Sequence, residues 1–228
     1  MNLSTNTLAI LKNFAGINSN IVFKPGSVIK TMAEAKNVLA KATVAEVFPD
    51  KEVGIYDLNE FLGVAGMFNA PEFKFSDDMN SVSIIEDKRS VKYFFSDTSI
   101  LTFPTKDINM PTAEVSFTLS QDDLNSLRKA ASTLGVNDVI VFGEEGSDEA
   151  FIKVSDVKDA TSNSFKIELA NVTRSNEPFN FVFNISNFKL MTGDYSVDVS
   201  SKLISHFKHQ SLDLEYWIAM EKSSTYGN

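Results

Sequence analysis

The hydrophobic residues near the middle of the chain repeat with the period of an α-helix. Leu124, Leu127 and Ala131 follow one another at three or four positions, which places them on one helical face. Ser120 precedes this run and Asp123 follows it by three residues, a spacing typical of a capping box. The pattern therefore predicts an amphipathic helix that begins near Ser120, almost halfway along a chain of 228 residues.

The same pattern stands at the start of the chain. A shift of 116 positions superimposes Leu3, Ser4, Leu8, Leu11 and Ala15 on Leu119, Ser120, Leu124, Leu127 and Ala131. Later segments also follow in one order in both halves: a β-rich run closed by a glycine-containing turn, a short helix, and a last strand rich in aromatic residues. Asp57 and Asn184 are the predicted caps of the two short helices. Because chance similarity does not preserve order, we interpret the chain as an internal duplication, with two unrelated α+β domains as the alternative.

The segment between the two halves lacks hydrophobic periodicity. Thr102–Val115 contains Pro104 and Pro111, which interrupt any regular element. It is also long for a connection inside one compact domain. The sequence therefore predicts a first domain at 1–101, a connecting linker at 102–115 and a second domain at 116–228.

The composition of the chain argues against several classes of protein. The chain has a net charge of −9, with 11 basic and 14 acidic residues up to Glu114 and 10 and 16 after it. Neither half is basic, which argues against nucleic-acid binding through a broad positive patch. The sequence contains no cysteine, and this excludes disulfides and thiolate metal sites. No basic segment with a following apolar run begins the chain, and no apolar stretch reaches the ~20 residues of a membrane span, so we expect a soluble intracellular protein.

The sequence shows no catalytic or phosphate-binding motif, so we expect neither an enzyme nor a bound cofactor. Its two histidines, His206 and His209, are three positions apart, which would suit a metal site only on a helix. Their surroundings favour a strand instead, where they would point to opposite faces. We therefore expect no metal site.

Three segments resemble, in the same order, parts of the sliding clamps of T-even-type bacteriophages. They are Asn2–Gly26, Ile55–Val64 and Phe179–Tyr195. The resemblance implies an α+β clamp fold of two similar domains, with antiparallel sheets outside and helices inside. It further implies a ring-forming homotrimer that encircles duplex DNA and tethers the replicative DNA polymerase.

The resemblance also implies partners and a location. An ATP-driven clamp loader and a late-transcription sigma factor or co-activator would use the same ring, in the cytoplasm of the infected bacterial host. An acidic outer surface would be compatible with this role, because enclosure rather than tight phosphate contact would retain the DNA. The alternative is a β-rich trimeric virion or assembly protein that does not bind DNA.

Three sets of site residues follow as expectations. The cations expected to face DNA are Lys12, Arg128, Lys129 and Lys189. They could equally be ordinary solvated cations of surface helices. The resemblance places the subunit interface between Val91, Tyr93 and Phe95 on one side and Phe165, Ile167 and Leu169 on the other. The aromatic residues of these strands could instead belong to the core.

The third set is a pocket for partner peptides. The resemblance places it close to the linker, whose apolar residues Phe103, Ile108 and Met110 are the expected wall. The alternative is that Ile108 and Met110 only hold the linker against its domain.

Overall fold

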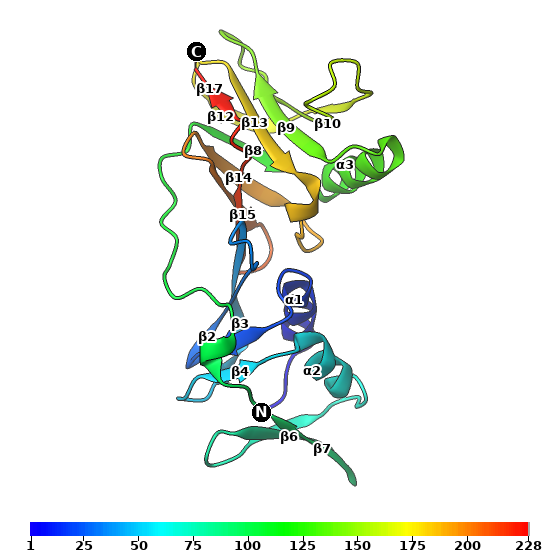
Figure 1. The fold of residues 1–228 in the computed structure, drawn as a ribbon, viewed down its shortest axis with the longest axis vertical. Helices are drawn as coiled ribbons and strands as arrows, with labels where there is room; N and C mark the ends of the chain where they lie inside the picture. Colours follow the sequence, from blue (N-terminus) through cyan, green and yellow to red (C-terminus); the bar gives the residue numbers. More distant parts are fainter. Residues whose placement is uncertain (228) are drawn as a thin grey trace. The chain divides into compact units, whose positions relative to one another are not determined.

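The structure is a computed structural model that describes residues 1–227, and its elements are drawn in Figure 1. The chain divides into two units after Asp107, a position inside the predicted linker Thr102–Val115. The limits 1–101 and 116–228 themselves stay predictions. No helix among residues 1–227 is both long and apolar enough to cross a membrane.

The first unit contains two helices and seven strands. In chain order they are α1 (Thr5–Ala15), β1 (Ile21–Phe23), β2 (Gly26–Met32), β3 (Val38–Phe48), β4 (Val53–Ile55), α2 (Leu58–Ala65), β5 (Glu72–Phe75), β6 (Ser81–Glu86) and β7 (Arg89–Phe94), followed by a short 3-10 helix, η1 (Thr98–Ile100). Strand β1 pairs with β4, β2 pairs with β3, and β5, β6 and β7 form a three-stranded sheet. All these pairs are antiparallel.

The second unit repeats this order and adds a strand before its helix and another at its end. Its elements are β8 (Val115–Leu119), α3 (Gln121–Leu134), β9 (Asp138–Gly143), β10 (Phe151–Ser155), β11 (Phe165–Glu168), β12 (Ala170–Arg174), β13 (Phe179–Asn184), η2 (Ile185–Asn187), β14 (Tyr195–Ser200), β15 (Ile204–His209), β16 (Leu214–Ala219) and β17 (Thr225–Tyr226). One antiparallel sheet has the order β11-β10-β9-β13-β17. In the other, β12, β8, β14, β15 and β16 are neighbours in that order.

The two units share their strand pairing, as the duplication predicts. Strand β1 pairs with β4 as β9 pairs with β13, and the meander β5-β6-β7 corresponds to β14-β15-β16. Strand β14 pairs with β8 at the start of the second unit, and in the first unit the N–H of Phe73 on β5 donates to the carbonyl of Met1 at 2.7 Å. The predicted fold of two similar α+β domains is therefore confirmed.

The helices begin where the sequence predicts. The Ser4 hydroxyl accepts a hydrogen bond from the N–H of Thr7 at 3.2 Å, and the Ser120 hydroxyl accepts one from Asp123 at 3.1 Å. Each serine thereby satisfies an N–H group that the first helical turn leaves unpaired. Helix α3 ends at Gly135, which adopts the left-handed conformation (φ 68°) favoured at helix ends. Asp57 caps α2 in the same way as the serines.

The short helix predicted for the second half is the main departure from the expected elements. Asn184 acts as a cap, as predicted, by accepting from the N–H of Ser186 at 3.0 Å. The chain then makes only the three-residue 3-10 turn η2, whereas α2 in the first unit has eight residues. The second unit therefore presents one long helix where the first presents two.

Candidate functional site

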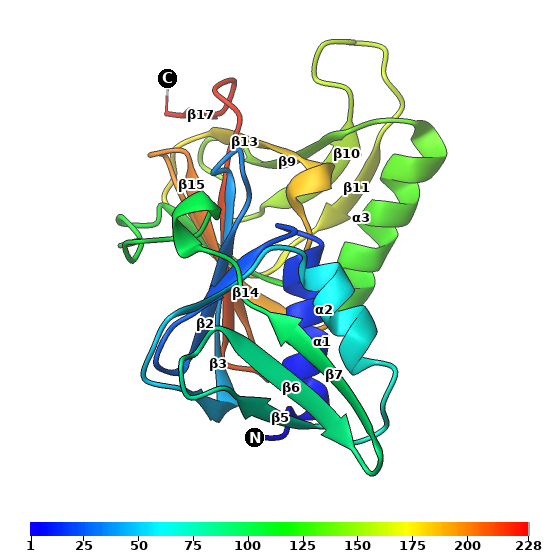
Figure 2. The same cartoon turned by 60° about the horizontal axis from the view of Figure 1, so that its bottom comes forward.

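The exposed faces of the helices carry two of the cations predicted to meet DNA. Helix α1 buries Ile10, Leu11 and Phe14 and exposes Lys12. Helix α3 likewise buries its apolar stripe and exposes Lys129. Helices α1 and α2 lie side by side in Figure 2, and α2 carries neither lysine nor arginine. Positive charge on the exposed face of each helix is therefore sparse.

Arg128 has a different environment from its counterpart Lys12. It is half-buried, and its Nη2 group donates to the carbonyls of Phe188 at 2.7 Å and Leu190 at 3.1 Å. These carbonyls follow η2, which is too short to satisfy them by helical hydrogen bonds. Lys189, between the two acceptors, is exposed. Arg128 therefore has a structural role, and its contact with DNA stays a prediction.

We expect Arg128→Ala to destabilise the second unit. Two carbonyls would lose a charged donor, and a hydrogen bond to a charged group contributes roughly 1.5–3 kcal/mol. Water would partly replace the two lost hydrogen bonds, so the free energy of unfolding is expected to fall by about 2–4 kcal/mol. Urea unfolding followed by circular dichroism measures this loss. The matched control is Lys129→Ala on the exposed side of the same helix; equal stability of the two variants would contradict the structural role.

The predicted interface residues of β7 face inward in the single chain. The Tyr93 ring meets Phe61 edge-to-face at 5.3 Å, and its hydroxyl donates to the carbonyl of Asp57 at 3.3 Å. Burial raises the pKa of Tyr93, as do the nearby carboxylates. Phe95 stacks on Phe75 at 5.9 Å. Tyr93 and Phe95 thus serve the core of the first unit, and their place in a subunit interface stays a prediction.

The other side of β7 is open. Lys92 and Phe94 point outward, and Phe94 is 66% exposed, with the Lys92 ammonium 5.0 Å from its ring centre. A shallow depression beside this edge also contains Tyr56 and Ile100, which are 62% and 66% exposed. An exposed apolar group of this kind at a strand edge is typical of a surface that pairs with another chain.

The predicted interface residues of the second unit lie on and just after β11. Phe165 is 37% exposed, Ile167 is half-buried, and Leu169 is buried immediately after the strand. Strand β11 forms one edge of its five-stranded sheet. In each predicted trio two residues lie on the strand and the third directly follows it, and both strands are sheet edges.

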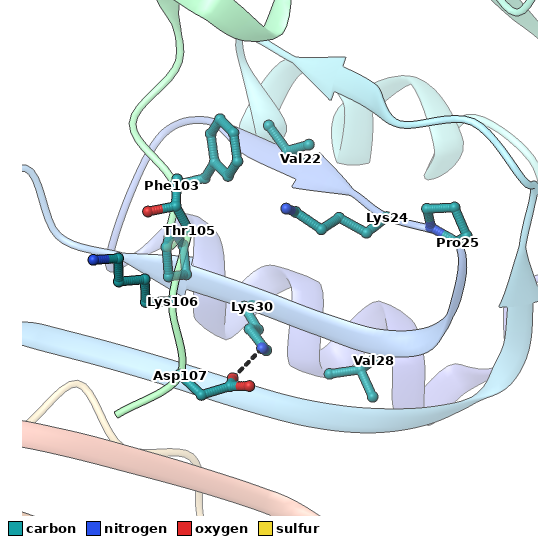
Figure 3. Close-up of a pocket in the computed structure, with 10 residues that line it drawn as sticks. Val22, Lys24, Pro25, Val28, Lys30, Phe103, Thr105, Lys106 and Asp107 are labelled. Atoms are coloured by element: carbon teal, nitrogen blue, oxygen red, sulfur yellow. Dashed lines mark hydrogen bonds and ion pairs between the residues drawn. The ribbon is translucent and has the colours of Figure 1, made fainter. Parts of the chain in front are cut away.

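A cavity of about 240 Å³ lies beside the start of the linker (Figure 3). Its apolar walls are Val22, Pro25, Val28, Phe103 and Pro104. The same cavity is rimmed by charge: Lys30 pairs with Asp107, and the Lys24 ammonium lies 5.3 Å from the centre of the Phe103 ring. An apolar floor with a charged rim suits a short peptide that inserts one or two hydrophobic side chains.

Of the three predicted pocket residues, only Phe103 lines this cavity. Ile108 and Met110 are half-buried and are not among its walls, so their role in partner binding stays a prediction. Sequence reasoning missed Val22, Val28 and Lys30 because they come from β1 and β2, far from the linker in sequence. Only the pairing of distant segments brings them to it.

The two histidines lie on β15, a strand as predicted. His206 stacks on Trp217, with ring centres 4.9 Å apart, and its Nε2 is 3.0 Å from Glu215. His209 is buried, and its Nδ1 accepts from the N–H groups of Ser211 and Leu212 at 3.0 and 3.2 Å. Within residues 1–227, no group of three or more His, Cys, Asp or Glu side chains is arranged to hold a metal ion.

Comparison with known proteins identifies the family of this chain. The family described as "gp45 sliding clamp, C terminal" matches residues 116–222, and "DNA polymerase processivity factor" matches residues 4–96. The sliding clamps of Escherichia phage RB69 and Enterobacteria phage T4 are each 32% identical over 99% of both chains. That of Vibrio phage KVP40 is 30% identical over 97% of this chain and 99% of its own. The chain belongs to the sliding clamp family.

Solved structures show the same fold at low sequence identity. Proliferating cellular nuclear antigen (PCNA) from Entamoeba histolytica aligns with the clamp over 94% of both chains, with a TM-score of 0.68 and 13% identity. The PCNA of A. fulgidus, solved with the C-terminal region of FEN-1, aligns over 96% of both chains, with a TM-score of 0.69 and 13% identity. Family membership makes the clamp a non-enzymatic polymerase processivity factor of a phage replication system.

Proposed function

We propose that this clamp forms a homotrimeric ring that encircles duplex DNA and holds the replicative polymerase on it. The observation that carries the proposal is the presence of two different open strand edges in one chain, β7 in the first unit and β11 in the second. Two unlike edges favour a head-to-tail contact, and head-to-tail contacts close into rings when the rotation permits. Because the chain belongs to the sliding clamp family, a closed ring is the assembly that would serve its function.

The exposed helix faces of each unit support sequence-independent contact with DNA inside such a ring. Lys12, Lys129 and Lys189 are exposed on or next to the helices, and α2 carries no lysine or arginine. A few exchangeable phosphate contacts would let the ring slide, while enclosure would prevent its loss. The charge of −9 is compatible with this arrangement because retention would not depend on tight electrostatic binding.

The experiment that tests this function is loading onto circular DNA. An ATP-driven clamp loader from a related phage should place the clamp on a nicked circle, and linearising the circle should release it. Light scattering should give the mass of a trimer. A trimer that never becomes trapped on the circle would instead favour the β-rich virion or assembly protein.

We further propose that the cavity beside the linker receives short hydrophobic peptides of the polymerase, the clamp loader and a late-transcription sigma factor or co-activator. Its apolar walls and charged rim support this, as does the related PCNA structure, which carries the C-terminal region of FEN-1. These partners would use one surface and therefore bind in turn.

We expect Val28→Asp to weaken binding of a polymerase C-terminal peptide. Val28 lines the cavity and is 36% exposed, so a carboxylate there would meet the apolar anchor of the peptide. Loss of one anchor costs more than about 1.4 kcal/mol, or roughly tenfold in Kd. Calorimetric titration measures the change. The matched control is Val47→Asp, at a 72% exposed position that does not line the cavity.

The same titration decides the role of Ile108. Weaker binding by Ile108→Asp would extend the pocket over the linker, and unchanged binding would remove Ile108 from it. Unchanged binding by Val28→Asp would overturn the assignment of the cavity. Light scattering in parallel shows whether each variant keeps the mass of the wild type.

A further inference from the structure

The mouth of the cavity beside the linker has the opposite charge to the rest of the clamp. Its lining includes three lysines, Lys24, Lys30 and Lys106, and one carboxylate, that of Asp107. The whole chain, in contrast, carries 21 basic and 30 acidic residues. A cationic mouth on an acidic protein favours an anionic group on whatever binds there, because opposite charges attract most strongly at close range.

The three lysines differ in their surroundings. The Lys24 ammonium is already 3.1 Å from a carboxylate oxygen of Glu52. The Lys106 side chain points away from the other lining residues in Figure 3. The side chain of Lys30 is only 28% exposed, and its ammonium donates a hydrogen bond to Asp107 across the mouth of the cavity (Figure 3). Lys30 is therefore the cation best placed to meet a bound ligand.

Asp107 is held at this position by little besides Lys30. Its side chain is 75% exposed, and the residue belongs to no helix or strand. The linker is tied to the first unit earlier, at Thr102, whose N–H donates to Asn20 at 3.1 Å and whose carbonyl accepts from Asn18 at 2.9 Å. Asp107 can thus swing away from the mouth while these bonds stay intact. An ion pair this exposed costs little to break.

The charges around Asp107 keep its carboxyl group ionised. Lys30 lowers the pKa of Asp107 through its hydrogen bond and its charge, and the charge of Lys41 on β3 adds to this. The free clamp therefore holds a carboxylate at the mouth of the cavity, which shows that a group of this size and charge fits beside Lys30.

We propose that the Lys30 ammonium receives a carboxylate of the partner peptide, and that Asp107 occupies its place in the free clamp. This inference rests on the proposed peptide-binding cavity and names the chemistry that the cavity selects. An apolar side chain of the peptide would enter between Val28 and Phe103, while its carboxylate replaces that of Asp107. Lys30 keeps a counter-ion in both states, so the exchange avoids the cost of a partly buried, unpaired charge.

Competition between the two carboxylates has a measurable consequence. Asp107→Asn removes the charge that a peptide must displace, so an acidic peptide should bind this variant about fivefold more tightly than the wild type. A neutral peptide draws nothing from Lys30, and its affinity should not change. Lys30→Gln should bind the acidic and the neutral peptide alike.

Calorimetric titration with four forms of one peptide tests this. The probe is the C-terminal peptide of a related phage DNA polymerase, with its Asp and Glu residues either kept or replaced by Asn and Gln. Each version is made as the free acid and as the C-terminal amide. The form that gains from Asp107→Asn shows whether a side chain or the C-terminus supplies the carboxylate. The matched controls are Asp77→Asn and Lys88→Gln, which are exposed, do not line the cavity and should bind as the wild type does.

Three results would overturn the carboxylate exchange and leave the cavity as the peptide site. They are equal binding of every form by Asp107→Asn and the wild type, equal strengthening of acidic and neutral forms by Asp107→Asn, and an acidic preference that survives in Lys30→Gln. Peptide binding that is insensitive to Val28→Asp would instead overturn the proposed cavity, and this inference with it.

Discussion

Replacing Lys92 by proline is expected to leave the clamp folded but monomeric. The N–H of Lys92 points to the open edge of β7, so its loss would remove no hydrogen bond to β6. Proline is tolerated on such an edge, but it cannot donate to a strand of a second chain, and its ring would obstruct the approach. A ring of three would lose a hydrogen bond at each junction. At micromolar protein we expect light scattering to report the mass of one chain.

Two controls separate assembly from folding. Lys92→Ala keeps the N–H and should stay trimeric. Tyr93→Pro should unfold the edge, because the Tyr93 N–H points toward β6. Proline at position 92 is also a cleaner test than a charge at Tyr93, which packs against Phe61. A trimer of unchanged mass from Lys92→Pro would show that β7 is not the assembly edge.

Reversing the charge of Lys12, Lys129 and Lys189 together is expected to abolish most loading onto DNA. All three are exposed and lie on or beside the helices, so Lys→Glu should leave the fold intact. Each lost phosphate contact reduces the slope of log K against log salt by about 0.9. Retained clamp on nicked circles is expected to fall on the order of tenfold or more at low salt, and the difference from the wild type should narrow at higher salt, where screening weakens the contacts of the wild type too. Arg128 is left unchanged because its hydrogen bonds support the fold.

The control for this variant has the same charge change at another surface. Lys158, Lys202 and Lys222 are exposed and lie outside the helices, and their joint replacement by Glu should preserve loading. Equal losses in both variants would assign the effect to total charge. Full loading of the first variant across a salt series would show that these lysines do not face DNA.

Local sequence signals predicted the start of each helix correctly. The hydroxyls of Ser4 and Ser120 cap α1 and α3, and the apolar stripe of α3 is the face it buries. These features depend on residues a few positions apart, which a sequence displays directly. The order of elements in the two halves was equally visible, because both halves kept their caps and turns.

Features that depend on distant segments could not be read in this way. Alternation shows that Val91, Tyr93 and Phe95 share a face, but only the packing of Phe61 and Phe75 shows that this face is covered. The second short helix is reduced to η2, and Arg128 donates to the carbonyls beyond it. No signal in the sequence identifies Arg128 as that donor.

The N-terminal helix gives a similar case. Glu46 of β3 accepts hydrogen bonds from Ser4 and Thr7. Burial by itself raises the pKa of this carboxyl, but these hydrogen bonds outweigh it and the net pKa is lowered. The partners are about forty positions apart in sequence, a distance over which spacing carries no information.

The two unlike edges of one chain have a genetic consequence. In a head-to-tail trimer every subunit contributes one β7 edge, and a single defective edge leaves the ring open. A chain altered at β7 still carries an intact β11, so it would enter mixed rings and spoil them. In cells that make both forms, the share of closed rings would then fall as the third power of the wild-type fraction. An altered β7 should therefore behave as a dominant-negative allele, even though the same chain on its own only fails to assemble.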